Sequence, residues 1–367
     1  MNQNPILLNP GPVTLSAGVR EAMLRPDLCH REPEFADLCL SIKHRLVSIY
    51  SDANENYEAV LLTGSGSCAV EAMINSLAPQ HATTLVVANG VYGERIEAML
   101  EAASRPHELI KGDWSKAMDL AAVEHAFENN PAISHVVAVH NETTTGRLND
   151  IASLAKLCQA HDKALMIDAV SSFAGELIDF SRWQPLAVAA TANKCLHSIP
   201  GMAFVLVKLS ELDDNYSQAQ TLYLDLFRYY QEQKTGFSPF TQSVQAAYAL
   251  DAAIDELNDN GGWQARHKRY MVLSRQIQNA LIDMEMPLLL EQTDYSSMIS
   301  SFHLPENWDY KKLHGTLKQA GFIIYAGQGH LQKMLFRIAN MGNISDSDWT
   351  RLINVFKTQV YSTEVVN

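Results

Sequence analysis

Lys194 is the residue whose surroundings in the sequence most directly suggest covalent chemistry. An apolar run at residues 186–190 precedes it, and a second apolar run at residues 202–205 follows it. Burial between two such strand-like runs would disfavour the ammonium form and lower the lysine pKa. An amine tuned in this way can form a Schiff base with an aldehyde. The alternative is a surface turn, because lysine is almost never fully buried unless it is paired.

Asp168 ends another apolar run and could serve the same site as Lys194. Residues 165–167 are Leu-Met-Ile, and small residues follow the aspartate. This pattern is typical of the carboxyl end of a buried parallel strand, where ligands bind. A carboxylate there could keep the pyridine nitrogen of pyridoxal phosphate protonated, so that the ring accepts electrons. A helix N-cap or turn aspartate is the alternative.

A Gly-Ser-Gly-Ser loop at residues 64–67 separates a strand-like run from a helix-like run. Apolar residues recur after it at positions 70, 73, 74 and 77, which is helical spacing. Glycines let the backbone approach a phosphate, and helix N-terminal amides with serine hydroxyls can bind it. The loop fits neither the P-loop nor the Gly-x-Gly-x-x-Gly pattern. It therefore predicts a phosphate site of another kind, with an ordinary Gly-Ser turn as the alternative.

In their order along the chain, these segments and several further motifs resemble the class V aminotransferases. The resemblance runs from about residue 6 to the last helix and is closest to members that use 2-aminoethylphosphonate and pyruvate. It implies the aspartate-aminotransferase-like α/β fold (fold type I), with a mostly parallel seven-stranded sheet and a smaller α+β C-terminal domain, and it implies pyridoxal phosphate as cofactor. The further motifs are Leu-Asn-Pro-Gly-Pro-Val-Thr at 8–14, Asn-Gly-Val-Tyr-Gly at 89–93, His-Asn-Glu-Thr-Thr-Thr-Gly at 140–146, Asp225, Gly-Gly-Trp-Gln-Ala-Arg at 261–266 and Phe-Arg-Ile at 336–338.

The resemblance implies a role for each matched residue. Lys194 holds the cofactor and moves the proton, and Asp168 pairs with the ring nitrogen. Tyr92 stacks on the ring, Thr143 bonds near its hydroxyl, and Arg337 binds the carboxylate of pyruvate or alanine through a bidentate fork. The alternatives are a core tyrosine for Tyr92, a turn threonine for Thr143 and a surface salt bridge for Arg337. Thr241 reaches the neighbouring subunit's phosphate, which implies a homodimer with shared sites. The other implied cofactor contacts are Ser65, Gly66 and Ser67, which bind the phosphate, and Val170 and Asn193.

Two departures from the family pattern bear on the amino donor. At 236–242 the family arginine is replaced by Gly236 and its histidine by a glutamine, and at 325–328 a lysine is replaced by Gln328. Two positive charges are therefore missing from a site expected to bind a phosphonate. Arg31 could supply a compensating charge, with a solvated surface turn as the alternative. Transamination of 2-aminoethylphosphonate with pyruvate, giving phosphonoacetaldehyde and L-alanine, is the expected reaction. An alanine– or serine–glyoxylate transaminase and a related lyase are the alternatives.

Strand-like and helix-like segments alternate along the first half of the chain. Such alternation predicts right-handed βαβ units and a mostly parallel sheet. Strands are expected at residues 58–63, 84–88, 135–140, 164–168, 186–191 and 202–208, and helices at 94–103, 117–128 and 151–161. Later elements are long helices at 241–283 interrupted at Gly261-Gly262, strands at 298–303, 322–325 and 335–339, a helix at 310–319 and a last helix from 346.

The predicted organisation is a large cofactor-binding domain at residues 14–260 and a small C-terminal domain at 261–367. The N-terminal segment 1–13 is expected to pack near the active site, and the polar and aromatic segment 210–236 is expected to cover it.

Composition and charge narrow the function classes. The chain of 367 residues has a net charge of −13, which argues against a general nucleic-acid or anionic-membrane binder. No apolar run is long enough for a membrane span, and no signal-peptide pattern opens the chain. Its five cysteines lack Cys-x-x-Cys spacing, so we expect reduced thiols in a cytoplasmic enzyme, with Cys195 as a packing residue. No spaced cluster predicts a metal site.

Overall fold

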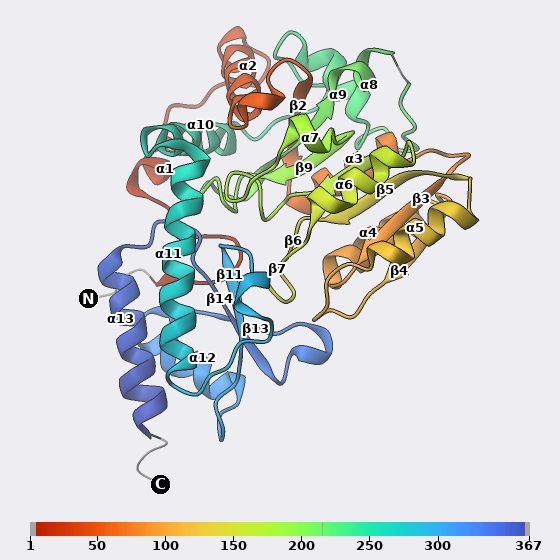
Figure 1. Ribbon diagram of the computed structural model, residues 1–367. Coiled ribbons are helices and arrows are strands. Elements are labelled where there is room, and N and C mark those ends of the chain that lie inside the picture. Colours follow the sequence, from red (N-terminus) through yellow and green to blue (C-terminus); the bar gives the residue numbers. More distant parts are fainter. Residues whose placement is uncertain (1–4, 215, 364–367) are drawn as a thin grey trace.

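The computed structural model describes residues 5–214 and 216–363, which form a large α/β part and a smaller α+β part (Figure 1). A seven-stranded sheet lies at the centre of the large part. Among its described strands, β10 alone runs in the opposite direction, so its pairings with β2 and β9 are antiparallel and the others are parallel. The order across the sheet is β2 (Tyr57–Gly64), β10 (Gly201–Lys208), β9 (Ala187–Thr191), β8 (Ala164–Asp168), β5 (Ile133–Val139), β3 (Thr83–Ala88) and β4 (His107–Lys111).

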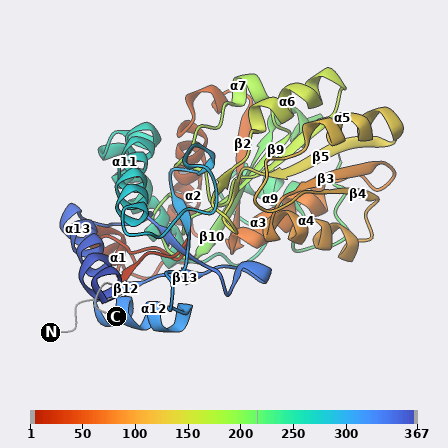
Figure 2. The same ribbon diagram turned by 60° about the horizontal axis from the view of Figure 1, so that its bottom comes forward.

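Helices cover both faces of this sheet, because its strands carry apolar side chains on both sides. In β2, Val60 and Leu62 join one apolar cluster and Ala59 and Leu61 the other, as the period of two requires. Figure 2 shows α5, α6 and α7 on one side of the sheet, and α3 and α4 on the other. The first face packs against α2 (Pro33–Ser48), α5 (Leu120–Asn129), α6 (Ile151–Ala160), α7 (Phe180–Trp183) and α10 (Val244–Asp259), and the second against α3 (Gly66–Leu77), α4 (Val91–Ala102) and α9 (Leu226–Gln233).

The smaller part is built on a three-stranded antiparallel sheet with its own apolar cluster, separate from the two large ones. The N-terminal strand β1 (Ile6–Leu7) pairs with β12 (Phe322–Ile323), and Leu8 is buried in this cluster. The other elements are β11 (Ile299–His303), β14 (Leu335–Ala339), β13 (Tyr325–Ala326), α11 (Gly262–Ile282), α12 (Tyr310–Gln319) and α13 (Asp346–Val355), while α1 (Ala17–Ala22) packs against α10. The division of the chain at residues 260 and 261 stays a prediction, which the separate clusters support.

The predicted elements agree with the structure except in a few places. The edge strand β4 was not predicted, because its sequence, His-Glu-Leu-Ile-Lys, is half exposed and mixes charges with apolar residues. The predicted strand at 322–325 is two strands, since β12 pairs with β1 and β13 pairs with β14. Helix α5 begins at Leu120 rather than at 117, because the Asp119 side chain accepts a hydrogen bond from the Ala122 N–H and caps it there.

The described residues of the segment at 210–236 form hydrogen bonds with β2 and α3, and the predicted role of this segment as a cover of the active site stays a prediction. It contains the end of α8 (Leu209–Asp214) and all of α9. The Gln233 side chain bonds both the N–H and the carbonyl of Leu61, at 2.9 and 2.7 Å, and the Ser76 hydroxyl donates to the Leu224 carbonyl at 3.0 Å. Within one chain the described part of this segment therefore covers strand β2 and helix α3.

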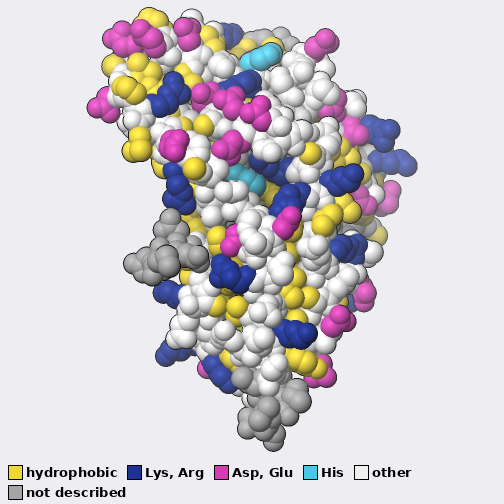
Figure 3. Space-filling model, turned by 90° about the vertical axis from the view of Figure 1, so that its left-hand side faces the viewer, with side chains coloured by type: hydrophobic (Ala, Val, Ile, Leu, Met, Phe, Trp, Pro, Cys, Tyr) yellow, Lys and Arg dark blue, Asp and Glu magenta, His cyan; other side chains and the backbone are white. Residues whose placement is uncertain are grey.

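On the face seen in Figure 3, acidic and basic side chains are interspersed. Within residues 5–214 and 216–363, no helix combines the length and the apolar content that crossing a bilayer requires.

Candidate active site

The carboxyl ends of the parallel strands bring most of the predicted residues to one edge of the sheet. Asp168 is the last residue of β8, and Lys194 lies in the turn after β9. Thr143 follows β5, and Ser65 follows β2. Ligands of open α/β sheets bind at this edge. The positions predicted from separate stretches of sequence thus lie at one edge of the sheet.

Asp168 is a buried carboxylate with a fixed orientation. Its side chain is 6% exposed, and its Oδ1 accepts a hydrogen bond from the Val170 N–H at 2.9 Å. Burial raises the pKa of Asp168 to about 6, whereas the Val170 bond and the charge of Lys194 act in the opposite direction. The group is therefore mostly ionised at pH 7 and can attract a proton to a nearby ring nitrogen.

Lys194 is held by the N-terminal segment as well as by its own turn. Its Nζ donates a hydrogen bond to the Pro10 carbonyl. A side chain at Gly11 would place a Cβ 2.7 Å from the Lys194 Cδ, and the backbone there has a φ of +102°, so this close approach requires glycine. Burial lowers the pKa of Lys194 to about 8, although the charge of Asp168 acts against it.

This lowered pKa predicts how the apoenzyme takes up an aldehyde cofactor. At pH 7 a pKa of about 8 leaves roughly a tenth of the amines neutral, against roughly three in ten thousand at the ordinary value of 10.5. The rate of covalent attachment should rise about tenfold per pH unit below pH 7 and level off above pH 9, as the pH passes the pKa. Stopped-flow absorbance of apoenzyme mixed with pyridoxal phosphate measures it. A rate still climbing at pH 10 would show an amine that is not desolvated.

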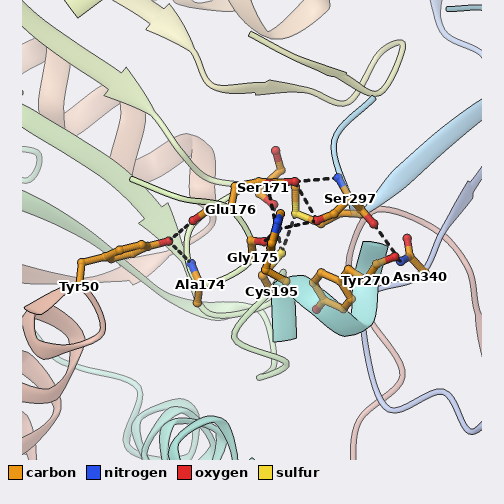
Figure 4. Close-up of polar contacts among 11 residues, drawn as sticks. Tyr50, Ser171, Ala174, Gly175, Glu176, Cys195, Tyr270, Ser297 and Asn340 are labelled. Carbon is orange, nitrogen blue, oxygen red and sulfur yellow. Dashed lines mark hydrogen bonds and ion pairs between the residues drawn. The ribbon is translucent and has the colours of Figure 1, made fainter. Parts of the chain in front are cut away.

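A hydrogen-bonded scaffold supports the turn beneath Lys194 (Figure 4). The Cys195 thiol donates to the Ser171 carbonyl at 3.2 Å and lies 3.0 Å from the Met298 sulfur. Burial raises the pKa of Cys195 to about 12, so the thiol is protonated at neutral pH. These contacts agree with the prediction that Cys195 is a packing residue and not a nucleophile.

The same scaffold joins the loop after Asp168 to the smaller part of the chain. The buried Glu176 carboxylate accepts hydrogen bonds from the Ser297 N–H and hydroxyl at 2.7 and 2.8 Å. Asn340 donates to the Ser297 carbonyl at 2.9 Å, and the Tyr50 hydroxyl donates to the Glu176 carbonyl at 2.6 Å (Figure 4). The site is therefore built on a framework that spans both parts of the molecule.

The Gly-Ser loop forms a cradle at the N-terminus of α3. Ser65 is the N-cap residue but makes no side-chain capping bond, so its hydroxyl is available to a ligand. A Cβ at Gly66 would lie 2.4 Å from Val170 Cγ1, so only glycine lets the helix start this close to the Asp168 loop. The cavity at this point is lined by Gly66, Ser67, Val70, Tyr92, Arg95, Ile96, Met99, Asp168 and Val170.

These residues fit pyridoxal phosphate. Tyr92 and Val170 would hold the ring, Asp168 would pair with its nitrogen, and helix amides with serine hydroxyls would hold the phosphate. Two residues before Thr143, both side-chain polar atoms of the buried Asn141 lack a hydrogen-bond partner in the described structure. Such atoms are rare unless a ligand or water completes them.

Arg337 is the buried cation at the opposite side of the site. It lies in β14, is 3% exposed, and donates to the carbonyls of Thr143 and Ala326 at 2.6 and 2.9 Å. Its Nη1 also donates to the Gln328 side chain at 3.2 Å. Gln328 therefore does more than remove the family's lysine charge, because it helps to orient the guanidinium.

The glycine at the other departure, Gly236, also has a structural cause. Gly236 follows α9 with a φ of +82°, and a Cβ there would lie 2.4 Å from the Ala36 carbonyl oxygen. An arginine could not occupy this backbone without moving α2.

Sequence reasoning missed Glu142, which positions Tyr92. The fully buried carboxylate accepts from the Thr144 N–H at 3.0 Å and from the Gly93 N–H at 3.4 Å, at the start of α4. A Cβ at Gly90 would lie 2.2 Å from the Glu142 Cδ. Its place in the His-Asn-Glu-Thr motif was the available signal, but no spacing rule links it to α4.

Three predicted residues are less closely tied to the site within one chain. Asn193 is partly buried and its Oδ1 accepts from the Thr191 hydroxyl at 2.9 Å. Thr241 is exposed in the segment before α10, and Arg31 is exposed in the turn before α2. Within the described residues, no hydrogen bond or ion pair joins Thr241 or Arg31 to the site. Their predicted roles stay predictions.

Comparisons with known proteins agree with this geometry. The family model Aminotransferase class-V matches residues 40–344. A 2-aminoethylphosphonate–pyruvate transaminase of Klebsiella pneumoniae is 36% identical, over 98% of this chain and 99% of that protein. The enzyme of the same name from Bacillus mycoides is 35% identical, over 96% and 98%. The crystal structure of a Thermus thermophilus aspartate aminotransferase superposes with a TM-score of 0.88 and 25% identity, over 96% of this chain and 98% of that one. The chain belongs to the class V aminotransferases, whose cofactor is pyridoxal phosphate.

Proposed function

We propose that this enzyme transfers the amino group of 2-aminoethylphosphonate to pyruvate, giving phosphonoacetaldehyde and L-alanine. The observation that carries the proposal is the near-full-length similarity to two transaminases named for this reaction. The arrangement of Lys194, Asp168 and Arg337 supports it, because the amine and the ring partner lie at one edge of the large sheet, and the guanidinium reaches the Thr143 carbonyl there from β14.

The chain's own residues would divide the chemistry as follows. Bound pyridoxal phosphate supplies an aldehyde that captures the donor nitrogen and a ring that accepts an electron pair. Lys194 Nζ, in its neutral form, takes the proton from the donor carbon and returns it at the neighbouring cofactor carbon. Asp168, ionised, holds the proton on the ring nitrogen. The second half-reaction with pyruvate reverses these proton movements.

Arg337 is proposed to bind the anionic end of both substrates. A guanidinium fork can grip a phosphonate as well as a carboxylate. Its Nε and one Nη donate to Ala326, Thr143 and Gln328, which fix its orientation and leave donors for a ligand. Since Gly236 and Gln328 carry no charge, Arg337 would supply most of the anion recognition.

The Arg337→Lys variant tests this assignment. Lysine keeps the charge but lacks the planar fork, so the half-reactions with 2-aminoethylphosphonate and with alanine should both slow by roughly 10- to 100-fold. Absorbance changes of the bound cofactor, with each amine supplied alone, measure the two half-reactions. Arg31→Ala is the matched variant and should leave both unchanged. Loss of only the 2-aminoethylphosphonate half-reaction in Arg31→Ala would move phosphonate binding to Arg31 instead.

We also propose a homodimer with shared sites, in which Thr241 serves the partner's cofactor phosphate. Its exposure in the single chain supports this. Mixing Lys194→Ala chains with Thr241→Ala chains should restore activity, since one site of each mixed dimer is then free of both changes. Mixed dimers that form without gaining activity over the two parents would contradict the sharing.

The five unpaired cysteines support a cytoplasmic location.

A further inference from the structure

Arg95 is a cation at the cradle that sequence reasoning did not single out. It lies three residues after Tyr92 on α4, and its guanidinium carbon is 4.7 Å from the centre of the Tyr92 ring. One of its Nη atoms donates to the Ser67 hydroxyl at 3.3 Å. It lines the same cavity as Gly66, Asp168 and Val170. The guanidinium is thus placed between the aromatic residue and the helix start of the site.

The charge of Arg95 is not neutralised by a carboxylate. Its neighbour Glu94 is engaged elsewhere, accepting from the Trp114 ring N–H at 2.9 Å and pairing with Lys111 at 3.1 Å. Across residues 5–214 and 216–363, no acidic side chain forms an ion pair with Arg95. Arg95 is also exposed in the single chain, so an incoming anion can reach it. Among the described residues, Arg95 is therefore a cation without an ion-pair partner beside a ligand cavity, and the Asp168 carboxylate lies within electrostatic range of it.

Two arginines mark two different places in the site. Arg337 bonds the Thr143 carbonyl from β14, whereas Arg95 bonds Ser67 at the start of α3. A helix N-terminus supplies only about half a positive charge. A phosphate that carries nearly two negative charges needs more, and a guanidinium offers both charge and several donors.

We propose that Arg95, together with Ser67, binds the phosphate of the cofactor. The inference rests on the proposed placing of that phosphate at Ser65, Gly66 and Ser67, and not on the identity of the amino donor. Arg95 is a binding residue in this account. Its stacking on Tyr92 orients the guanidinium and ties the ring-stacking residue to the phosphate end of the cavity.

The test compares two cofactor forms that differ only in the phosphate. Equilibrium binding of pyridoxal phosphate and of pyridoxal to apoenzyme is measured by absorbance for the parent, Arg95→Gln, Arg95→Lys and Arg182→Gln. Arg182 is the matched control, since it is an exposed arginine on α7 whose side chain pairs with Asp179. Arg95→Gln should weaken pyridoxal phosphate binding roughly 10- to 100-fold and leave pyridoxal binding within about twofold. Arg95→Lys should be intermediate, and Arg182→Gln unchanged.

Three results would overturn the inference. Equal weakening of both ligands would show that Arg95 acts by packing on Tyr92. Unchanged affinity for both would show that it has no part in binding. Unchanged cofactor affinity with a slowed half-reaction for 2-aminoethylphosphonate alone would assign the guanidinium to the donor. Because cofactor binding is measured without any amine donor, a wrong donor assignment leaves the first two outcomes unaffected.

Discussion

Replacing Lys194 with alanine is expected to lower turnover by at least about 10⁴-fold, because the variant loses both the amine that holds the aldehyde and the base that moves the proton. The fold should survive, since the side chain is only partly buried and its one hydrogen bond is to the Pro10 carbonyl. Cofactor should still bind without a covalent bond, through Asp168, Tyr92 and the Gly-Ser cradle.

Borohydride reduction of the cofactor-loaded protein, followed by peptide mass analysis, checks this result. The parent should carry the cofactor on Lys194, and the Lys194→Ala variant should carry none. Lys268→Ala, which removes an exposed lysine on α11, is the control and should behave as the parent. Labelling of a different lysine, or substantial turnover in Lys194→Ala, would refute the assignment.

Replacing Asp168 with asparagine is expected to lower the rate by several orders of magnitude while leaving cofactor binding less affected. The amide has nearly the same shape and can still accept the Val170 hydrogen bond, but it cannot hold the ring nitrogen protonated. The electron sink is then lost at the step that removes the donor proton. A rate within about tenfold of the parent, equivalent to about 1.4 kcal/mol in the barrier, would mean that the ring charge is set elsewhere.

Steady-state rates and cofactor titration of the same preparations separate the two effects. Asp150→Asn is a matched control, because Asp150 caps α6 through the Ser153 N–H and asparagine caps a helix as well as aspartate does. Its activity should equal that of the parent. The comparison also decides between the two interpretations of Asp168 that the sequence left open, a cap residue and a ring partner.

Much of the fold was predictable because both faces of the sheet are covered. Buried strands such as β8 and β10 read as continuous apolar runs, and the helices between them repeat with helical spacing. Strand β4 was not predicted because it lies at the sheet edge, with a neighbouring strand on one side only. The division of the predicted strand at 322–325 into β12 and β13 was not predicted, because their partners, β1 and β14, lie far apart in the sequence.

The site was predictable to the extent that strand ends determine it. Asp168 and Lys194 stand at the ends of apolar runs, so the topology places them together once the parallel order is known. Glu142 and Arg95 act through contacts with Gly93 and Ser67, which lie in segments distant in the sequence. Gln328 acts through a side-chain contact with Arg337 on the neighbouring strand. No local spacing rule reports such contacts.

The central claim is most directly tested by supplying the cofactor-loaded enzyme with 2-aminoethylphosphonate alone. The account predicts conversion of the bound cofactor to its amine form, followed by absorbance, with release of one phosphonoacetaldehyde per site and return to the aldehyde form when pyruvate is added. Alanine should drive the same conversion, because it is the product of the second half-reaction. The proposed reaction would be contradicted if 2-aminoethylphosphonate did not convert the bound cofactor to its amine form, while alanine or serine did so readily and glyoxylate then served as the acceptor.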